Sequence, residues 1–169
     1  YAIKYPDKVG DLRIGAEVRF NTTRDIERDL FTALNTQRTP MSPNVLLRNA
    51  RTESHGLLTV YGLTINEPKF PLYGKVCWNQ KMGRNELMTA TNYCKTAVML
   101  HRTLGALAPT NVSHIPPILQ KLSDELGIQT IRDNTYRFFE VVDEIWGIRG
   151  VKFIELTTHL RSNFLGTLA

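Results

Sequence analysis

Four carboxylates in the last third of the chain are the first residues whose spacing could support catalysis. Glu140, Asp143 and Glu144 lie close together, and Glu155 follows them; a metal-dependent nuclease needs carboxylates that converge in this way. Glu140 and Glu144 are, however, four residues apart in a segment that we expect to be helical, and the other face of that helix is aromatic. The pattern is typical of a solvated acidic face. We therefore assign no catalytic residue and no metal site.

A cysteine and a histidine form the second candidate pair. Cys94 and His101 lie on one stripe of an expected helix, but the stripe is otherwise apolar, which favours core positions for both residues. The spacing of the two cysteines, Cys77 and Cys94, and of the four histidines fits no zinc site. The common nucleotide-binding, metalloprotease and hydrolase motifs are not found in the sequence either. The sequence therefore predicts a non-enzymatic protein without a cofactor, whose thiols are reduced and buried.

Positive charge is concentrated in the middle of the chain. The 169 residues include 21 Lys and Arg against 16 Asp and Glu, which gives a net charge of +5. Between Arg38 and Arg102 there are nine basic residues and only three acidic ones. Such a segment suits an anionic partner, whether nucleic acid, an acidic membrane or an acidic protein, although it is also compatible with an ordinary solvated surface. The candidates for anionic-surface binding are Lys69, Lys75, Lys81, Arg84, Arg48 and Arg51.

Two further features of this middle segment bear on partners. Aromatic residues are interleaved with the bases and could stack on single-stranded RNA, so an RNA-binding module is the alternative function; they are Tyr61, Phe70, Tyr73, Trp78 and Tyr93. Residues 39–56 contain two prolines and look like a long irregular segment, of a kind that is often functional. The apolar residues of this segment are the candidates for self-association: Met41, Val45, Leu46 and Leu47.

The elements that would position these residues follow from hydrophobic periodicity. Residues 56–65 are apolar on both alternating faces, which predicts a central strand covered on both sides. Strict alternation over 12–20 predicts a strand with one face in water. Further strands are expected at 73–79 and 151–157, and helices at 23–37, 84–108, 116–126, 133–146 and 159–168.

This order of elements predicts an α+β fold in a single globular domain over residues 1–169. We expect a small antiparallel or mixed sheet packed by several helices, a helical second half, and an extended arm over residues 1–10. No apolar run is long enough for a membrane span and no signal peptide is visible, so we expect an intracellular protein, in the cytoplasm or the nucleus.

The segment that runs from Val18-Arg19-Phe20-Asn21 through Thr22-Thr23-Arg24-Asp25-Ile26 to Leu34 resembles rhabdovirus matrix proteins. In both, a basic alternating strand passes into a polar-capped helix, a loop and a second apolar strand; the similarity covers about residues 12–65. The chain departs from that pattern in its longer 39–56 segment, in the helices of its second half and in having no proline-rich late-domain motif.

Matrix proteins of that family are non-enzymatic. They self-associate, bind anionic membrane and condense the nucleocapsid. The resemblance therefore implies a structural virion protein that forms homo-oligomers and meets membrane or nucleoprotein through a basic surface.

Overall fold

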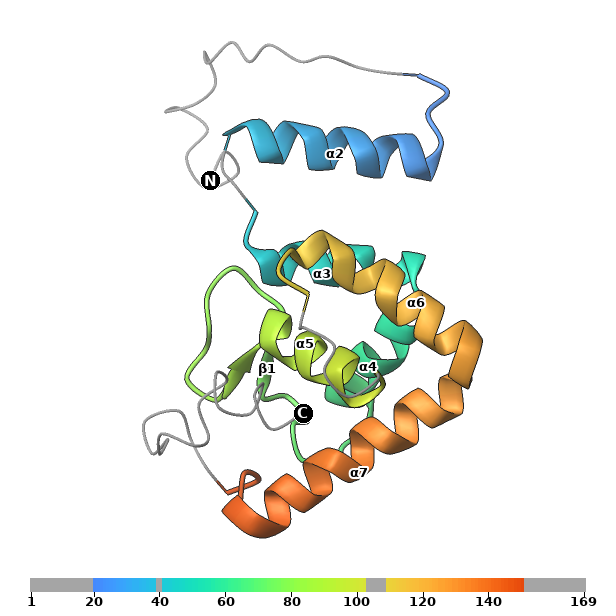
Figure 1. The fold of residues 1–169 in the computed structure, drawn as a ribbon. Coiled ribbons are helices and arrows are strands. Elements are labelled where there is room, and N and C mark those ends of the chain that lie inside the picture. Colours follow the sequence, from blue (N-terminus) through green and yellow to red (C-terminus); the bar gives the residue numbers. More distant parts are fainter. Residues whose placement is uncertain (1–19, 39–40, 103–108, 151–169) are drawn as a thin grey trace, which may run out of the picture. The chain divides into compact units, whose positions relative to one another are not determined.

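The computed structural model describes residues 20–38, 41–102 and 109–150 (Figure 1). The chain divides into two compact units, residues 1–40 and residues 41–169. The single globular domain expected over residues 1–169 stays a prediction, since residues 1–19, 39–40, 103–108 and 151–169 are not described. The predicted arm at 1–10, nearly all of the strand at 12–20, the strand at 151–157 and the helix at 159–168 lie outside the described residues.

The first unit contributes one described helix, α2 (Arg24–Arg38), which confirms the helix predicted at 23–37. The Thr23 hydroxyl caps this helix by accepting the Ile26 N–H at 3.4 Å. Thr22 donates to the Glu27 carboxylate at 2.6 Å. Asp25 and Glu27 stand in the first turn, where negative charge stabilises the helix dipole.

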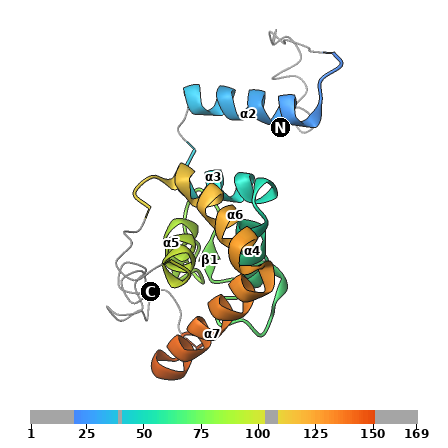
Figure 2. The same ribbon diagram turned by 45° about the vertical axis from the view of Figure 1, so that its right-hand side comes forward.

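The second unit is a helix-dominated α+β fold, as predicted (Figures 1 and 2). Its strands β1 (Val76–Cys77) and β2 (Met88–Thr89) pair in parallel, so the antiparallel option is not borne out. The strand expected at 73–79 is confirmed only over β1. The described helices of this unit are α3 (Pro43–Ala50), α4 (His55–Asn66), α5 (Ala90–Leu100), α6 (Ile115–Leu126) and α7 (Ile128–Trp146), with 3-10 turns η1 (Arg51–Glu53) and η2 (Val112–His114).

The predicted central strand at 56–65 is wrong, because this segment is helix α4. The Ser54 hydroxyl caps the helix by accepting the Leu57 N–H at 3.2 Å. The helix has no charged residue, so no polar face reveals its 3.6-residue period, and a helix that is apolar all round reads like a strand covered on both sides. The segment nevertheless contributes to the core, since the side chain of Val60 is fully buried.

Two other boundaries differ from the expectation. The irregular segment at 39–56 contains α3 and η1; Ser42 caps α3 by accepting the Val45 N–H, and Pro43 starts the helix. The long helix expected at 84–108 begins only at Ala90, because the residues before it form β2, and it ends at Leu100.

Helices α6 and α7 match the prediction more closely. Gly127 separates them at a φ of +86°, and Gly147 ends α7 at a φ of +65°, a backbone region that favours glycine. Helix α7 starts five residues before the expected 133. Two apolar residues of these helices face solvent: Leu126 of α6 is 43% exposed and Ile145 of α7 is 65% exposed.

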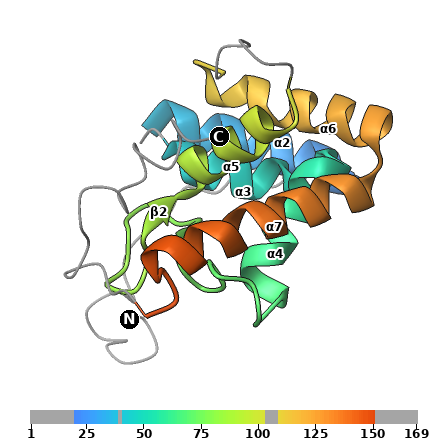
Figure 3. The same cartoon turned by 60° about the horizontal axis from the view of Figure 1, so that its bottom comes forward.

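The core lies between α4, α5, α6 and α7 (Figures 1 and 3). An aromatic cluster lies at its centre: Phe70 packs edge-to-face on Tyr93 and on Phe139, and the Tyr93 and Phe139 rings are tilted against each other. The Tyr93 hydroxyl donates to the Val60 carbonyl at 2.9 Å, and the Trp78 indole N–H donates to the Thr64 hydroxyl at 3.0 Å. These bonds satisfy the polar atoms that the aromatic side chains carry into the interior.

The crossing of α4 and α6 predicts a cost for adding one methyl group. A Cβ on Gly56 would lie 2.2 Å from the Leu119 carbonyl oxygen, which is backbone and cannot rotate away. Gly56→Ala should therefore lower the free energy of unfolding by about 1–3 kcal/mol, as overpacking does. Chemical denaturation of dilute protein, followed by circular dichroism, measures it.

Gly62→Ala on the same helix is the matched control, because only the Asn66 amide, at 4.0 Å, lies near the added atom. This variant should keep or raise the stability, by up to about 1 kcal/mol from helix propensity. Equal stability of the two variants would contradict the close packing of α4 on α6.

Candidate anionic-surface interface

The segment between β1 and β2 carries two of the predicted basic residues at the surface. Lys81 and Arg84 are exposed there, and Met82 between them is 36% exposed. The Gly83 N–H donates to the Glu86 carboxylate and closes the turn. The segment therefore presents an apolar side chain flanked by two cations.

Helix α3 holds this segment and adds a third cation. The Arg48 guanidinium donates to the Asn79 side-chain oxygen at 2.7 Å, and the Ser42 N–H donates to the Gln80 side chain at 3.0 Å. Arg48 thus lies against the residues that lead into the turn. We call this set the basic loop surface: Arg48, Lys81, Met82 and Arg84.

Two other predicted residues belong to a different place, the end of α7. The Lys75 ammonium donates to the carbonyls of Ile148 and Arg149, at 2.9 and 2.8 Å. The Arg149 guanidinium donates to the Lys69 carbonyl at 2.8 Å. Burial lowers the pKa of Lys75, and the nearby Asp143 carboxylate partly opposes that shift. Lys75 therefore stabilises the fold through these two hydrogen bonds. The predicted six-residue site is not one cluster.

The remaining predicted cation, Arg51, stacks on an aromatic ring. Its guanidinium carbon lies 5.1 Å from the centre of the Tyr61 ring, and its Nη1 donates to the Arg48 carbonyl. Arg51 begins the turn η1 between α3 and α4, and its side chain contacts the Arg48 backbone and the Tyr61 ring.

The basic residues of the second unit differ in whether they form ion pairs. The basic residues of α6 and α7 all pair with carboxylates: Lys121 with Glu125, Arg132 with Glu67 and Asp133, and Arg137 with Glu140. Within residues 20–38, 41–102 and 109–150, no ion pair forms at Arg48, Lys81 or Arg84. The charge of the basic loop surface is therefore not neutralised by described residues.

The aromatic residues do not form the stacking platform that the RNA alternative expects. Phe70, Trp78 and Tyr93 are buried in the core, and Trp78 packs edge-to-face on Tyr61 and Tyr93. Tyr73, 43% exposed, is the one large exposed side chain of the five. The sequence could not reveal this, because interleaving along the chain does not say which side of each element faces water.

The predicted self-association residues are also largely part of the fold. Leu47 is fully buried and belongs to the core, which contradicts its assignment to an exposed segment. Met41, Val45 and Leu46 are half-buried. Helix α3 packs on α5, and Leu47 is the residue of this run that is fully buried.

The candidates for catalysis occupy structural positions. Asp143 accepts from the Arg149 guanidinium and backbone, and Glu140 pairs with Arg137 at 3.7 Å; Glu155 lies outside the described residues. No group of three metal-ligating side chains occurs in the part of the chain that the structure describes. Burial raises the pKa of the thiols of Cys77 and Cys94, which leaves neither as an activated nucleophile.

Comparison of the chain with protein-family models, with curated proteins and with solved structures finds no match. The described helices include none that is both long enough and apolar enough to cross a membrane.

Both thiols should be unreactive in the folded protein, since they are buried and their pKa values are raised. With an aromatic disulfide reagent at neutral pH, we expect little reaction within minutes and two equivalents of released thiolate after denaturation in guanidinium. Rapid modification of Cys94 in the native protein would show that helix α5 is not packed as described.

Proposed function

We propose that this chain is a non-catalytic structural protein that binds an anionic membrane surface through its basic loop surface and assembles with copies of itself. The observation that carries the proposal is the exposed Met82 between two cations that lack ion-pair partners among the described residues.

Both the cations and the exposed apolar side chain favour binding to an anionic membrane. Each Lys or Arg near such a surface contributes about 1 kcal/mol, and the attraction requires that the cation is not already neutralised. An apolar side chain at the tip of the turn can enter the boundary between headgroups and acyl chains, where interfacial proteins bury their apolar faces. Arg48 supplies further charge behind the turn.

Single-stranded RNA is the less favoured partner for this surface. Sequence-independent binding of single strands combines cations with exposed aromatic side chains on which bases stack. Three of the five candidate aromatic residues are buried, and none of the five lies in the turn that holds Lys81 and Arg84. Condensation of a nucleocapsid, which the family resemblance implies, is an expectation separate from the membrane contact.

Reversing the two exposed charges tests the membrane contact. The variant Lys81→Glu/Arg84→Glu should bind vesicles of phosphatidylserine and phosphatidylcholine at least tenfold more weakly, because each position loses about 1 kcal/mol of attraction. Met82→Ser should also bind more weakly, without any change in charge. Flotation of the vesicles at 0.1 M salt measures the bound fraction.

The control variant Lys121→Glu/Arg137→Glu changes the net charge equally on α6 and α7, at residues that already pair with carboxylates. Its binding to the same vesicles should be much closer to that of the wild type than the binding of the Lys81→Glu/Arg84→Glu variant. A matched assay with single-stranded RNA separates the two functions: loss of RNA binding alone in the Lys81→Glu/Arg84→Glu variant would overturn the membrane proposal, and so would equal vesicle binding by all variants.

A further inference from the structure

Helix α4 has an outer face that the described part of the chain leaves partly exposed. The helix contains no charged residue, and a helix that is apolar all round is normally buried on all sides. Its inner side chains Leu57 and Val60 are fully buried, yet Leu58 is 46% and Ile65 is 41% exposed. The sequence of α4 is thus that of an internal helix, while part of its surface faces solvent.

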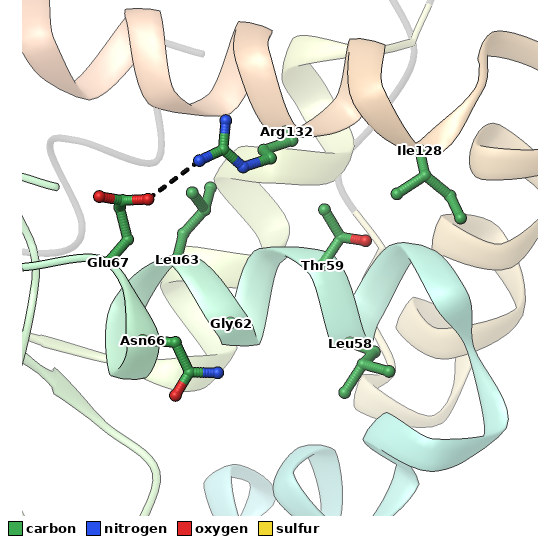
Figure 4. A pocket seen from close by; sticks show the side chains of 8 residues that line it. All are labelled: Leu58, Thr59, Gly62, Leu63, Asn66, Glu67, Ile128 and Arg132. Carbon is green, nitrogen blue, oxygen red and sulfur yellow. Dashed lines mark hydrogen bonds and ion pairs between the residues drawn. The ribbon is translucent and has the colours of Figure 1, made fainter.

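The uncovered face borders a groove of about 300 Å³ between α4 and α7 (Figure 4). Figure 4 shows Thr59 and Leu63 pointing toward α7, whereas Leu58 and Asn66 point to the outer side of α4. Gly62 lies between them, and an added Cβ there would meet only the Asn66 amide, at 4.0 Å. The backbone of α4 is therefore open to close approach at the centre of this face.

The charges around the groove do not favour an anionic surface as its occupant. At one end, Glu67 pairs with Arg132 at 3.0 Å, and a second hollow continues past both residues along α7. That hollow is lined by three acids and two bases: Glu67, Asp133, Glu140, Arg132 and Arg137. The rim carries no excess of positive charge, in contrast to the basic loop surface, so it offers acidic lipid or nucleic acid no unpaired cation.

The rim is close to neutral, because its bases already pair with its acids, so it does not repel a second copy of itself. A two-fold axis brings the same patch of two molecules together, so that apolar residues meet at the centre and the paired charges of the two rims lie at its edge. We propose that the outer face of α4, centred on Gly62 and flanked by Leu58 and Ile65, is the contact with a second copy of this chain. The proposal deepens the assembly part of the proposed function and does not involve the basic loop surface.

Two substitutions that the single molecule can accommodate test this contact. Gly62→Arg places a long cation in open space, and Leu58→Glu changes a side chain that is already half-exposed. Sedimentation equilibrium without lipid or nucleic acid should show dimers for the wild type and at least a tenfold higher dissociation constant for each variant. Circular dichroism should show unchanged helix content in both.

The matched control is Ile145→Arg, which adds a cation at a more exposed apolar residue of α7 that does not line the groove. It should assemble like the wild type, and so should Lys81→Glu/Arg84→Glu. A wild type that stays monomeric to millimolar concentration would overturn the proposal, as would folded Gly62→Arg and Leu58→Glu variants that dimerise normally. Vesicle binding by monomeric Gly62→Arg would leave the membrane proposal intact, so the two proposals fail separately.

Discussion

The close approach of two backbones, at Gly56 of α4 and Leu119 of α6, is the constraint on which the second unit depends. No side chain fits between them, since a Cβ on Gly56 would stand 2.2 Å from the Leu119 carbonyl oxygen. Helix α6 is thereby fixed on α4, and α7 follows after a single residue, Gly127, so its start is fixed as well. The Tyr93 hydroxyl then ties α5 to the Val60 carbonyl of the same central helix. The helix pairs its backbone groups internally, and this bond satisfies the polar atom that Tyr93 brings into the core beside it.

The far end of α7 is held by charge rather than by apolar packing. Lys75 donates to the carbonyls of Ile148 and Arg149 just beyond the helix, where cations satisfy the last carbonyl groups. Arg149 in turn contacts Asp143 and the Lys69 carbonyl. The basic residues therefore fall into two groups. Those near α6 and α7 form hydrogen bonds or ion pairs within the unit, whereas Arg48, Lys81 and Arg84 form no ion pairs with described residues.

Local signals in the sequence were enough to predict some elements and not others. Helices α2, α6 and α7 have polar faces, capping residues or a glycine stop, and these were found within a few residues. Helix α4 was mistaken for a strand because its segment has no charged residues, and so the 3.6-residue spacing of polar positions that marks a helix is not visible. Helix α3 was missed although Ser42-Pro43 is a helix-start signal, because two prolines in the segment suggested a loop.

The candidate site shows the same limit. Lys75 and Lys81 are close together in the sequence, but Lys75 precedes β1 and Lys81 follows it, so they lie at opposite ends of the strand. Leu47 looked exposed only because α3 was not recognised. The exposed Met82 was missed, although an apolar residue beside a glycine and between two bases, Lys81-Met82-Gly83-Arg84, is a signal that could have found it. Which aromatic residues face water is set by tertiary packing, and a single sequence does not report that.

The most direct test of the central place of α4 is native-state hydrogen exchange of the whole chain, resolved by residue. Amides that open only when the domain unfolds exchange most slowly, and they mark its most stable unit. The structure predicts that the amides of Leu57, Val60 and Leu63 are among the slowest, with protection close to that expected from the global free energy of unfolding. Exchange of these amides as fast as that of the exposed turn at Lys81 and Met82 would contradict an α4 packed between α6, α7 and α5.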